Sequence, residues 1–128
     1  MDLTAAEKRM ARVLWMVGMA LAFGVGGGQA LAGQKEFSGI AAYYSQDYKG
    51  RTASGVLYDP NKLTAAHKTL PFGTRVRVTD PRSKRSVVVV INDRGPFTKG
   101  RVIDLSLAAA KELRMMDRGI IQVTAELQ

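Results

Sequence analysis

The residues that could do chemistry in this chain are a few acids and a single histidine. Asp93 and Arg94 come shortly after four consecutive valines at residues 87–90, and Gly95 and Pro96 come next. An unbroken apolar run is typical of a strand buried on both faces, and the glycine and proline end it. The pattern predicts a carboxylate and a guanidinium at the rim of a stiff strand, where a group can meet a substrate in fixed geometry. An Asp–Arg pair that merely ties down a turn explains the same pattern.

The residue inventory argues against several kinds of site. His67 is the only histidine and there is no cysteine, so no ligand-spaced cluster appears, and we expect neither a metal nor a cofactor. No serine lies in a nucleophile-elbow sequence. The glycine run at residues 26–28 lies in the N-terminal segment, and no phosphate-binding glycine loop follows it.

Acid–base chemistry on a glycosidic bond fits the remaining residues better. Glycoside hydrolases usually need two carboxylates at a fixed separation, and only Asp59, Asp93 and Asp104 lie at comparable turn or strand ends. A lytic transglycosylase needs fewer groups, because the 6-hydroxyl of muramic acid attacks the anomeric carbon of its own sugar. One carboxyl group can then act first as acid and later as base. Asp93, with His67 and Arg94 near it, is sufficient for that reaction.

The N-terminal segment predicts export. Lys8, Arg9 and Arg12 precede an uncharged run at residues 13–25, and residues 30–32 read Ala-Leu-Ala, a small-x-small cleavage pattern. We expect a signal peptide over residues 1–32, since the apolar run is shorter than the roughly 20 residues of a retained membrane anchor. Without cysteine there is no lipid attachment site and no disulfide, so we expect a periplasmic or secreted protein that is not a lipoprotein.

The charge indicates a polyanionic partner. Removing residues 1–32 takes away three of 19 basic and two of 11 acidic residues, which leaves a net charge of +7. A small basic domain is drawn to polyanions, and export argues against nucleic acid. Cell-wall glycan, teichoic polymers and anionic lipid head groups remain, as does a surface that only keeps the protein soluble.

The rest of the chain predicts a small, mainly β protein. Residues 33–38 are expected to form a tether. Turn signals separate five or six short strands, and Ser106 is placed to cap one short helix. The strands are expected at residues 40–44, 63–67, 74–79, 87–90, 102–104 and 120–127, and the helix at 107–115. Turns this frequent favour a closed barrel.

Several motifs resemble a known family in order and spacing. They are Thr52-Ala53-Ser54-Gly55, Leu63-Thr64-Ala65-Ala66-His67, Leu70-Pro71-Phe72-Gly73-Thr74, Asn92-Asp93-Arg94-Gly95-Pro96-Phe97 and Arg101-Val102-Ile103-Asp104-Leu105-Ser106. Over residues 39–126 they resemble the rare lipoprotein A (RlpA) domain. The resemblance implies a six-stranded double-psi β-barrel at residues 39–127, related to expansins and to the barrel of membrane-bound lytic transglycosylase A. It also implies endolytic cleavage of peptidoglycan glycan strands to 1,6-anhydromuramyl products during daughter-cell separation, with division-site proteins as further partners.

The resemblance also assigns site residues. Asp93 matches the family's proposed acid/base and His67 a histidine needed in active members, while Thr52, Ser54, Arg94 and Asp104 match groups that line the groove. Tyr48 in the loop at residues 45–55 could add sugar contacts. Simpler roles are a packed histidine for His67, a helix-entry carboxylate for Asp104, and barrel packing for Tyr43 and Tyr44.

One departure from the family affects the function. The family commonly has Glu directly after the Thr-Ala-Ser-Gly motif, and this chain has Val56 there. Asp59 could partly replace that Glu, or Val56 could be a simple core residue. The first hypothesis is a monomeric lytic transglycosylase, with Asp93 as acid/base and His67 as its polar partner. The alternative, which Val56 favours, is a non-catalytic, expansin-like module that binds peptidoglycan.

Overall fold

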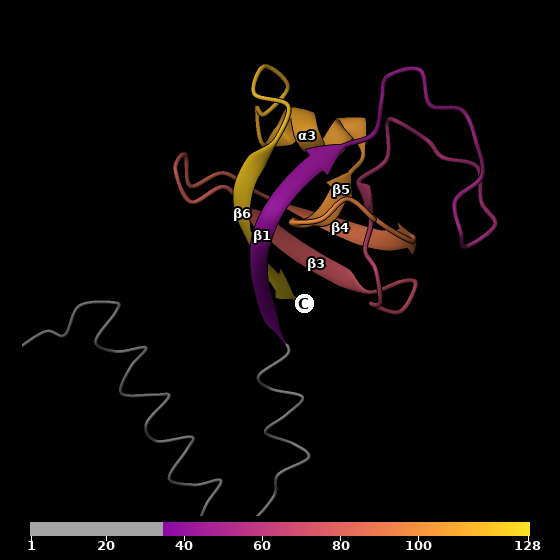
Figure 1. Cartoon of the computed structure of the whole chain (residues 1–128), viewed down its shortest axis with the longest axis horizontal. Coiled ribbons are helices and arrows are strands. Elements are labelled where there is room, and N and C mark those ends of the chain that lie inside the picture. Colours follow the sequence, from indigo (N-terminus) through magenta and orange to yellow (C-terminus); the bar gives the residue numbers. More distant parts are fainter. Residues whose placement is uncertain (1–34) are drawn as a thin grey trace, which may run out of the picture. The chain divides into compact units, whose positions relative to one another are not determined.

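The computed structural model describes residues 35–128, which form six strands and one short helix (Figure 1). The signal peptide predicted for residues 1–32 lies outside the described residues. The strands are β1 (Glu36–Tyr43), β2 (Thr64–Ala66), β3 (Arg75–Thr79), β4 (Ser86–Asp93), β5 (Arg101–Leu105) and β6 (Ile121–Leu127), and the helix is α3 (Leu107–Glu112). Among the described residues, no helix has the length and apolarity required to cross a membrane.

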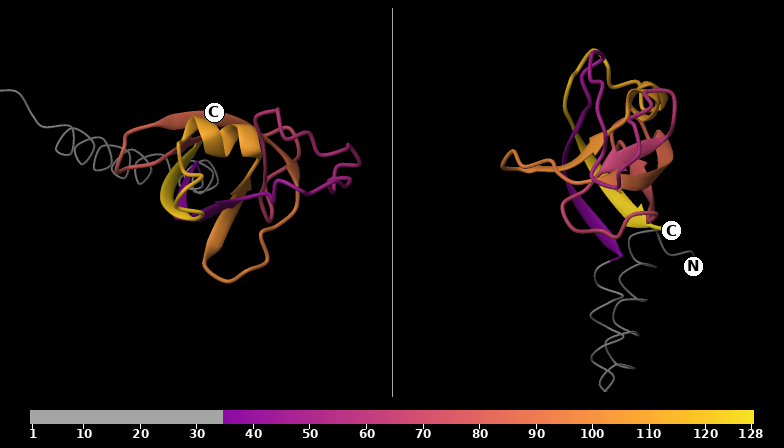
Figure 2. Two further views of the ribbon diagram at one scale, coloured as in Figure 1. Left: turned by 90° about the horizontal axis from the view of Figure 1, so that it is seen from above. Right: turned by 90° about the vertical axis from the view of Figure 1, so that its right-hand side faces the viewer.

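The strands close into a barrel in the order β1-β5-β2-β4-β3-β6. Figure 2 shows the molecule from two further sides. β1 and β5 pair in parallel, as do β2 and β4, and the remaining neighbours are antiparallel. Parallel pairs require long crossover connections rather than hairpins, and the crossovers carry the loops of the site. The predicted fold class, a small six-stranded barrel with one short helix, is confirmed.

The first strand begins earlier than expected. Residues 36–38 were predicted to be part of a tether, but Glu36 already pairs with Glu126, Phe37 with Ala125 and Ser38 with Thr124. The physical reason is that β6 alternates buried and exposed residues along its whole length and offers a long edge to pair with.

The barrel interior is filled by alternate residues of each strand. Val76 and Val78 of β3 are fully buried, as the alternation of residues 74–79 predicts. On β4, Val89 and Ile91 are fully buried, but the burial pattern alternates, and Val88 and Val90 are only half-buried. The expectation that this strand is buried on both faces is therefore wrong, because a small barrel has a single packed interior.

The helix closes one end of the core. Ser106 is its N-cap and accepts a hydrogen bond from the amide of Ala109 at 3.2 Å. The helix was expected to reach residue 115 but ends at Glu112, since Leu113 forms the C-cap and Arg114 has a left-handed φ of 53°. Leu113 and Met115 are nevertheless fully buried, so the segment after the helix still contributes to the core.

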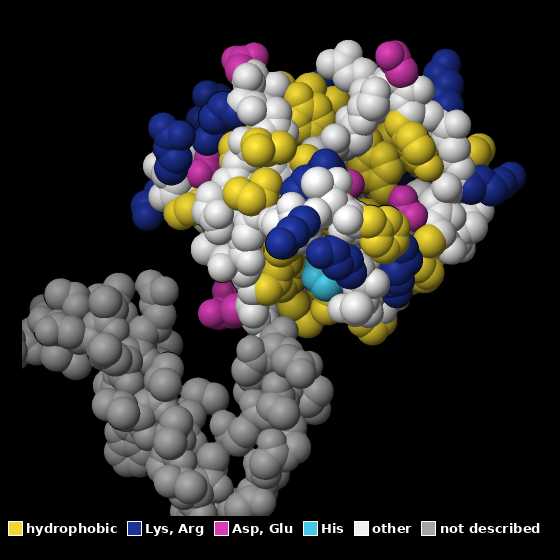
Figure 3. Space-filling model, in the orientation of Figure 1, with side chains coloured by type: hydrophobic (Ala, Val, Ile, Leu, Met, Phe, Trp, Pro, Cys, Tyr) yellow, Lys and Arg dark blue, Asp and Glu magenta, His cyan; other side chains and the backbone are white. Residues whose placement is uncertain are grey.

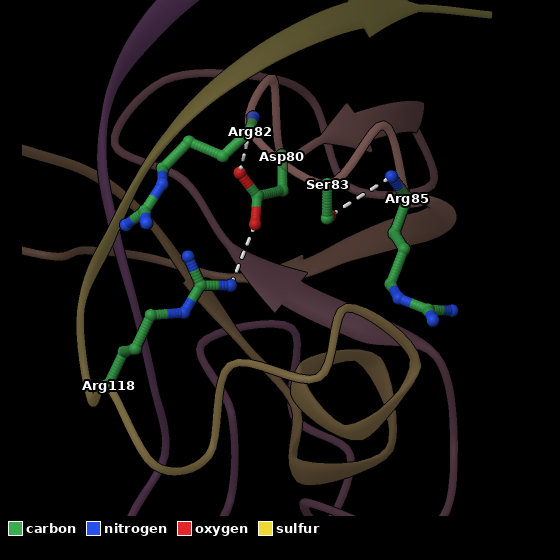
Figure 4. Close-up of polar contacts among 5 residues, drawn as sticks. All are labelled: Asp80, Arg82, Ser83, Arg85 and Arg118. Atoms are coloured by element: carbon green, nitrogen blue, oxygen red, sulfur yellow. Dashed lines mark hydrogen bonds and ion pairs between the residues drawn. The ribbon is translucent and has the colours of Figure 1, made fainter.

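A buried carboxylate fixes the hairpin between β3 and β4 (Figure 4). Asp80 is fully buried and accepts hydrogen bonds from the Arg118 guanidinium at 2.7 Å and the Arg82 amide at 2.9 Å. Burial alone would raise the pKa of Asp80, but the hydrogen bond and charge of Arg118, with the Arg82 amide, outweigh it and lower the pKa. The pair joins the hairpin to the turn before β6. In Figures 1 and 2 this hairpin and the long loop after β1 lie on opposite sides of the barrel.

Candidate active site

Asp93 is the last residue of β4 and its carboxylate is fixed from three sides. Oδ1 accepts hydrogen bonds from the amides of Ala53, at 2.7 Å, and Arg94, at 2.9 Å. Oδ2 accepts a hydrogen bond from the hydroxyl of Tyr44. The side chain is half-buried, so the carboxylate is held in one orientation at the barrel rim, as the strand pattern predicts.

The strand register brings a second carboxylate to the same end of the barrel. Ala66, the last residue of β2, pairs with Asp93 on one side and with Asp104 of β5 on the other. The Asp104 carboxylate forms an ion pair with Arg101, three residues earlier on the same strand. Asp104 is therefore close to the site, but its charge is already partly neutralised. The helix N-cap itself is Ser106, and the Asp104 carboxylate bonds to Arg101.

The Thr-Ala-Ser-Gly motif forms a tight turn against β4. Thr52 is buried, with 4% of its surface exposed, and its hydroxyl hydrogen-bonds to the Ser54 hydroxyl at 2.8 Å and to the Val56 carbonyl at 3.1 Å. The Ser54 amide donates to the carbonyl of Asn92 at 3.2 Å, which anchors the turn beside Asp93. Thr52 thus positions the loop that supplies the Ala53 amide, whereas Ser54 is exposed and available to a ligand.

Val56 lies on the surface of the same loop. Half of its surface is exposed, so the suggestion that it is a core residue is wrong. The preceding Gly55 has φ +95°, a conformation that favours glycine, and an added Cβ there would meet no atom within 4 Å. The position where the family commonly has Glu therefore faces solvent next to the turn that holds Asp93.

Three tyrosines form a cluster beside Asp93. Tyr44 stacks on Tyr58 with ring centroids 4.4 Å apart and an interplanar angle of 13°, and Tyr48 meets both rings edge-on. Tyr58 is buried and its hydroxyl accepts a hydrogen bond from the Leu107 amide at the start of α3. Tyr48 is 38% exposed, consistent with the sugar contacts predicted for it.

Tyr44 is the site residue that the sequence analysis did not identify. Tyr43 packs against the core, as expected, and donates to the carbonyl of Met116. Tyr44, on the opposite side of the chain, instead bonds to Asp93. Burial first, then the hydrogen bond and charge of Asp93 and the charge of Asp104, raise the pKa of Tyr44. Barrel packing is therefore confirmed for Tyr43 and wrong for Tyr44. Alternation along a strand turns one of two successive side chains away from the core, but it does not specify which group that side chain meets.

His67 is adjacent to Asp93 through the backbone only. Its amide donates to the Asp93 carbonyl at 3.1 Å, but its Nδ1 accepts hydrogen bonds from the amides of Thr69 and Leu70, each at 3.1 Å. Its ring packs edge-on against Phe37, with centroids 5.0 Å apart. Burial, and then the charges of Arg94 and Lys68, lower the pKa of His67. Its imidazole is therefore a neutral acceptor that shapes its own loop, and Tyr44 takes the place of polar partner to Asp93.

Arg94 supports the same loop. Its guanidinium donates to the carbonyls of His67, at 3.2 Å, and Leu70, at 2.8 Å, and its Cζ lies 4.1 Å from the centre of the Phe72 ring. In the described part of the chain the ion pairs are Arg101–Asp104 and Arg118–Asp80. The alternative of an Asp93–Arg94 ion pair is therefore wrong.

Asp59 lies in a turn of its own. Its carboxylate accepts a hydrogen bond from the Asn61 amide at 2.9 Å, the usual way in which aspartate stabilises a turn. The structure gives it no contact with the Asp93 carboxylate, whose donors are named above. Its proposed replacement of the family Glu gains no support.

The surface around the site combines basic and aromatic groups. Figure 3 shows the histidine, in cyan, beside Lys and Arg side chains, and on the same face a hollow with hydrophobic side chains and acidic atoms at its margin. Within residues 35–128, no three His, Asp or Glu side chains are arranged to hold a metal ion. The arrangement offers one oriented carboxylate, flanked by an aromatic cluster and a basic loop.

The fold and the site define a barrel protein that presents an oriented carboxylate at a strand end. Residues 36–125 match the family model described as "Lytic transglycolase". The chain belongs to this family, the RlpA-type double-psi β-barrels.

Comparison with individual proteins agrees with this assignment. The chain is 56% identical over 94 residues to the "Probable endolytic peptidoglycan transglycosylase RlpA" of Nostoc sp., an alignment that covers 71% of this chain and 25% of the relative. It is 54% identical over 90 residues to the "Endolytic peptidoglycan transglycosylase RlpA" of Pasteurella multocida, an alignment that covers 70% of this chain and 31% of that relative. The chain thus spans only a quarter to a third of these relatives.

Solved structures share the barrel. The Streptomyces papain inhibitor superposes with a TM-score of 0.60 at 27% identity, covering 73% of this chain and 94% of the inhibitor. A Clavibacter michiganensis expansin mutant in complex with cellohexaose gives a TM-score of 0.58 at 22% identity, and the superposition covers 73% of this chain and 50% of the expansin. The second likeness concerns the fold alone.

Proposed function

We propose that this protein is an endolytic peptidoglycan lytic transglycosylase. The observation that carries the proposal is the Asp93 carboxylate, held at the rim of the barrel by the amides of Ala53 and Arg94 and the hydroxyl of Tyr44. Membership of the lytic transglycolase family and the names of the relatives support it. Both relatives extend well beyond the matched region, so the proposal rests on this chain's own site.

The proposed reaction needs only Asp93 as a proton carrier. The Asp93 carboxyl group donates its proton to the glycosidic oxygen as the bond from that oxygen to the anomeric carbon breaks. The 6-hydroxyl of the same muramic acid then bonds to the anomeric carbon, and the carboxylate accepts the hydroxyl proton. The product is a 1,6-anhydro ring, and no water enters the reaction. The nucleophile is already intramolecular, which removes most of the entropic cost of bringing it to the reacting carbon.

The surroundings of Asp93 favour this reaction over hydrolysis by two carboxylates. A hydrolase requires a second free carboxylate at a fixed distance. The two other candidate carboxylates from the sequence are engaged, Asp104 in an ion pair with Arg101 and Asp59 in a turn. A mechanism that uses one carboxylate twice matches the groups that remain.

Substrate contacts are proposed for the exposed residues next to Asp93. Tyr48 offers an aromatic face for sugar stacking, and Ser54 offers an exposed hydroxyl on the turn. Arg94 shapes the 67–72 loop and acts indirectly. The net positive charge of the domain favours approach to an anionic wall polymer.

Export and a role in daughter-cell separation complete the proposal. The basic start and apolar run at residues 1–32 support export to the compartment that contains peptidoglycan. We propose action as a monomer, with division-site proteins as partners that direct it to the septum.

A non-catalytic peptidoglycan-binding module is the alternative, and Val56 favours it. One experiment separates the two. The purified protein is incubated with intact and with amidase-treated peptidoglycan, 1,6-anhydromuramyl products are measured by mass spectrometry, and binding to the same sacculi is measured by co-sedimentation. Products support the transglycosylase. Binding without products under both conditions would contradict it and support the binding module.

A further inference from the structure

The two oxygens of the Asp93 carboxylate are not equivalent. Oδ1 accepts two hydrogen bonds, from the amides of Ala53 and Arg94. Backbone N–H groups donate only, and a carboxylate oxygen has about two lone-pair sites. A proton placed on Oδ1 would therefore have to displace one of the amides. The free proton-binding position of Asp93 is on Oδ2.

Among residues 35–128, Oδ2 meets a single group, the hydroxyl of Tyr44. That hydrogen bond occupies one lone-pair site and leaves the other open to a substrate. We propose that Oδ2 is the oxygen that transfers the catalytic proton and that Tyr44 is the residue that positions it. The inference rests on the proposed function and specifies how the same site works.

Tyr44 is suited to this role because it cannot easily move or ionise. Its ring is stacked on Tyr58, which is buried and bonded to the start of α3, and Tyr48 packs against its edge. Burial and the neighbouring Asp93 raise the pKa of Tyr44, so the phenol keeps its proton and remains a donor at the pH of the reaction.

The proton then follows a balanced path. Oδ2 gives its proton to the glycosidic oxygen as the bond to the anomeric carbon breaks, and the resulting carboxylate is stabilised by the hydrogen bond from Tyr44. Oδ2 next accepts the proton of the 6-hydroxyl as the anhydro ring closes. Tyr44 donates its hydrogen bond throughout and never loses its own proton.

The test compares two adjacent substitutions that each remove one phenol oxygen. Tyr44→Phe keeps the ring stack but deletes the donor to Oδ2. Tyr43→Phe is the matched control, because its hydroxyl bonds to the Met116 carbonyl away from the site. We expect Tyr44→Phe to lower kcat by about 10- to 100-fold, the range for a hydrogen bond to a charged group, with KM within about twofold. Tyr43→Phe should change neither kcat nor KM.

A second measurement does not depend on turnover. The chemical shift of the Asp93 carboxyl carbon is measured by NMR at one fixed pH in the wild type, Tyr44→Phe and Tyr43→Phe, with thermal melts to verify folding. We expect this resonance to move only in Tyr44→Phe, because the carboxylate loses a hydrogen bond there. An unchanged resonance in Tyr44→Phe would overturn the positioning role, whether or not the wild type makes product. Absence of anhydro products from the wild type, with the resonance moved in Tyr44→Phe, would instead overturn the proposed function and leave the Tyr44–Asp93 hydrogen bond in place.

Discussion

The backbone amide of His67 donates to the carbonyl oxygen of Asp93 at 3.1 Å, while the side chains of the two residues bond elsewhere. The imidazole accepts from the amides of its own loop, and the carboxylate accepts from Ala53, Arg94 and Tyr44. The pairing of β2 with β4 therefore brings the two residues together but gives them separate tasks. Substitutions at the two positions should consequently have different signatures.

Asp93→Asn should abolish turnover while preserving the fold and binding. The amide oxygen of Asn can still accept from Ala53 and Arg94, but the side chain cannot carry the proton. We expect formation of 1,6-anhydromuramyl products to fall by about 100-fold or more, with unchanged co-sedimentation on sacculi. Asp117→Asn, in an exposed turn, is the control for the change of charge and should retain full activity. Wild-type product yield from Asp93→Asn would refute its role as acid/base.

His67→Ala should act mainly through the loop at residues 68–70. Removing Nδ1 leaves the amides of Thr69 and Leu70 without their acceptor, which should lower the free energy of unfolding by about 1–2 kcal/mol. His67→Asn places an amide oxygen near the same position and should recover part of that loss. Urea unfolding of the three proteins, combined with product yield, checks this. A collapse of activity without any loss of stability in both variants would show a direct chemical role instead.

The lowered pKa of His67 predicts a pH dependence of stability. The unfolded chain takes up a proton near the ordinary value of 6.5, whereas the folded chain does so only at lower pH. The contribution of the neutral His67 imidazole to the free energy of unfolding is therefore fully present above pH 6.5. It is lost as the pH falls below 6.5 towards the pKa of the folded protein. The midpoint of urea unfolding should decline between pH 7 and pH 5 in the wild type more than in His67→Asn. Equal declines in the two proteins would assign the effect to other groups.

Arg118→Met should destabilise the barrel without affecting the site. It leaves the fully buried Asp80 carboxylate with the Arg82 amide but without its cation, which should cost about 3 kcal/mol. The pKa of Asp80 is lowered in the folded protein. The ionised Asp80 therefore contributes to the free energy of unfolding above its ordinary pKa of 3.8, and this contribution is lost as the pH falls through the folded pKa. Urea unfolding at pH 7 measures the loss. Arg75→Met, on an exposed position of β3, is the control and should be nearly neutral.

Val56→Glu should raise any transglycosylase activity. The side chain is half-exposed on the turn that supplies the Ala53 amide to Asp93, so a carboxylate can be added there without burying a charge. We expect a several-fold increase in product yield and a thermal midpoint within a few degrees of the wild type. Leu57→Glu, at the more exposed next residue, adds the same charge and should not raise activity. If neither substitution changes the yield, the missing Glu does not limit the reaction.

Much of the framework could be predicted from the sequence because local patterns specify it. The alternation around Val76 and Val78 predicted a half-buried strand, Ser106 predicted the helix start, and the position of Asp93 after an apolar run predicted a carboxylate at the rim. The errors came where the pattern alone was ambiguous. Four valines fit a strand buried on two faces as well as the one-sided strand of a barrel, and residues 36–38 became a strand only because β6 extends beside them.

The sequence by itself determined the closed-barrel class, the basic charge and the position of the Asp93 carboxylate at a strand end, because these depend on residue type and short-range periodicity. The tertiary structure decided which groups surround that acid. Tyr44 and Ala53 reach it from 49 and 40 positions away, and Arg118 reaches Asp80 from 38. Such contacts depend on strand register and on the course of long loops, which bring residues together irrespective of their spacing in the chain.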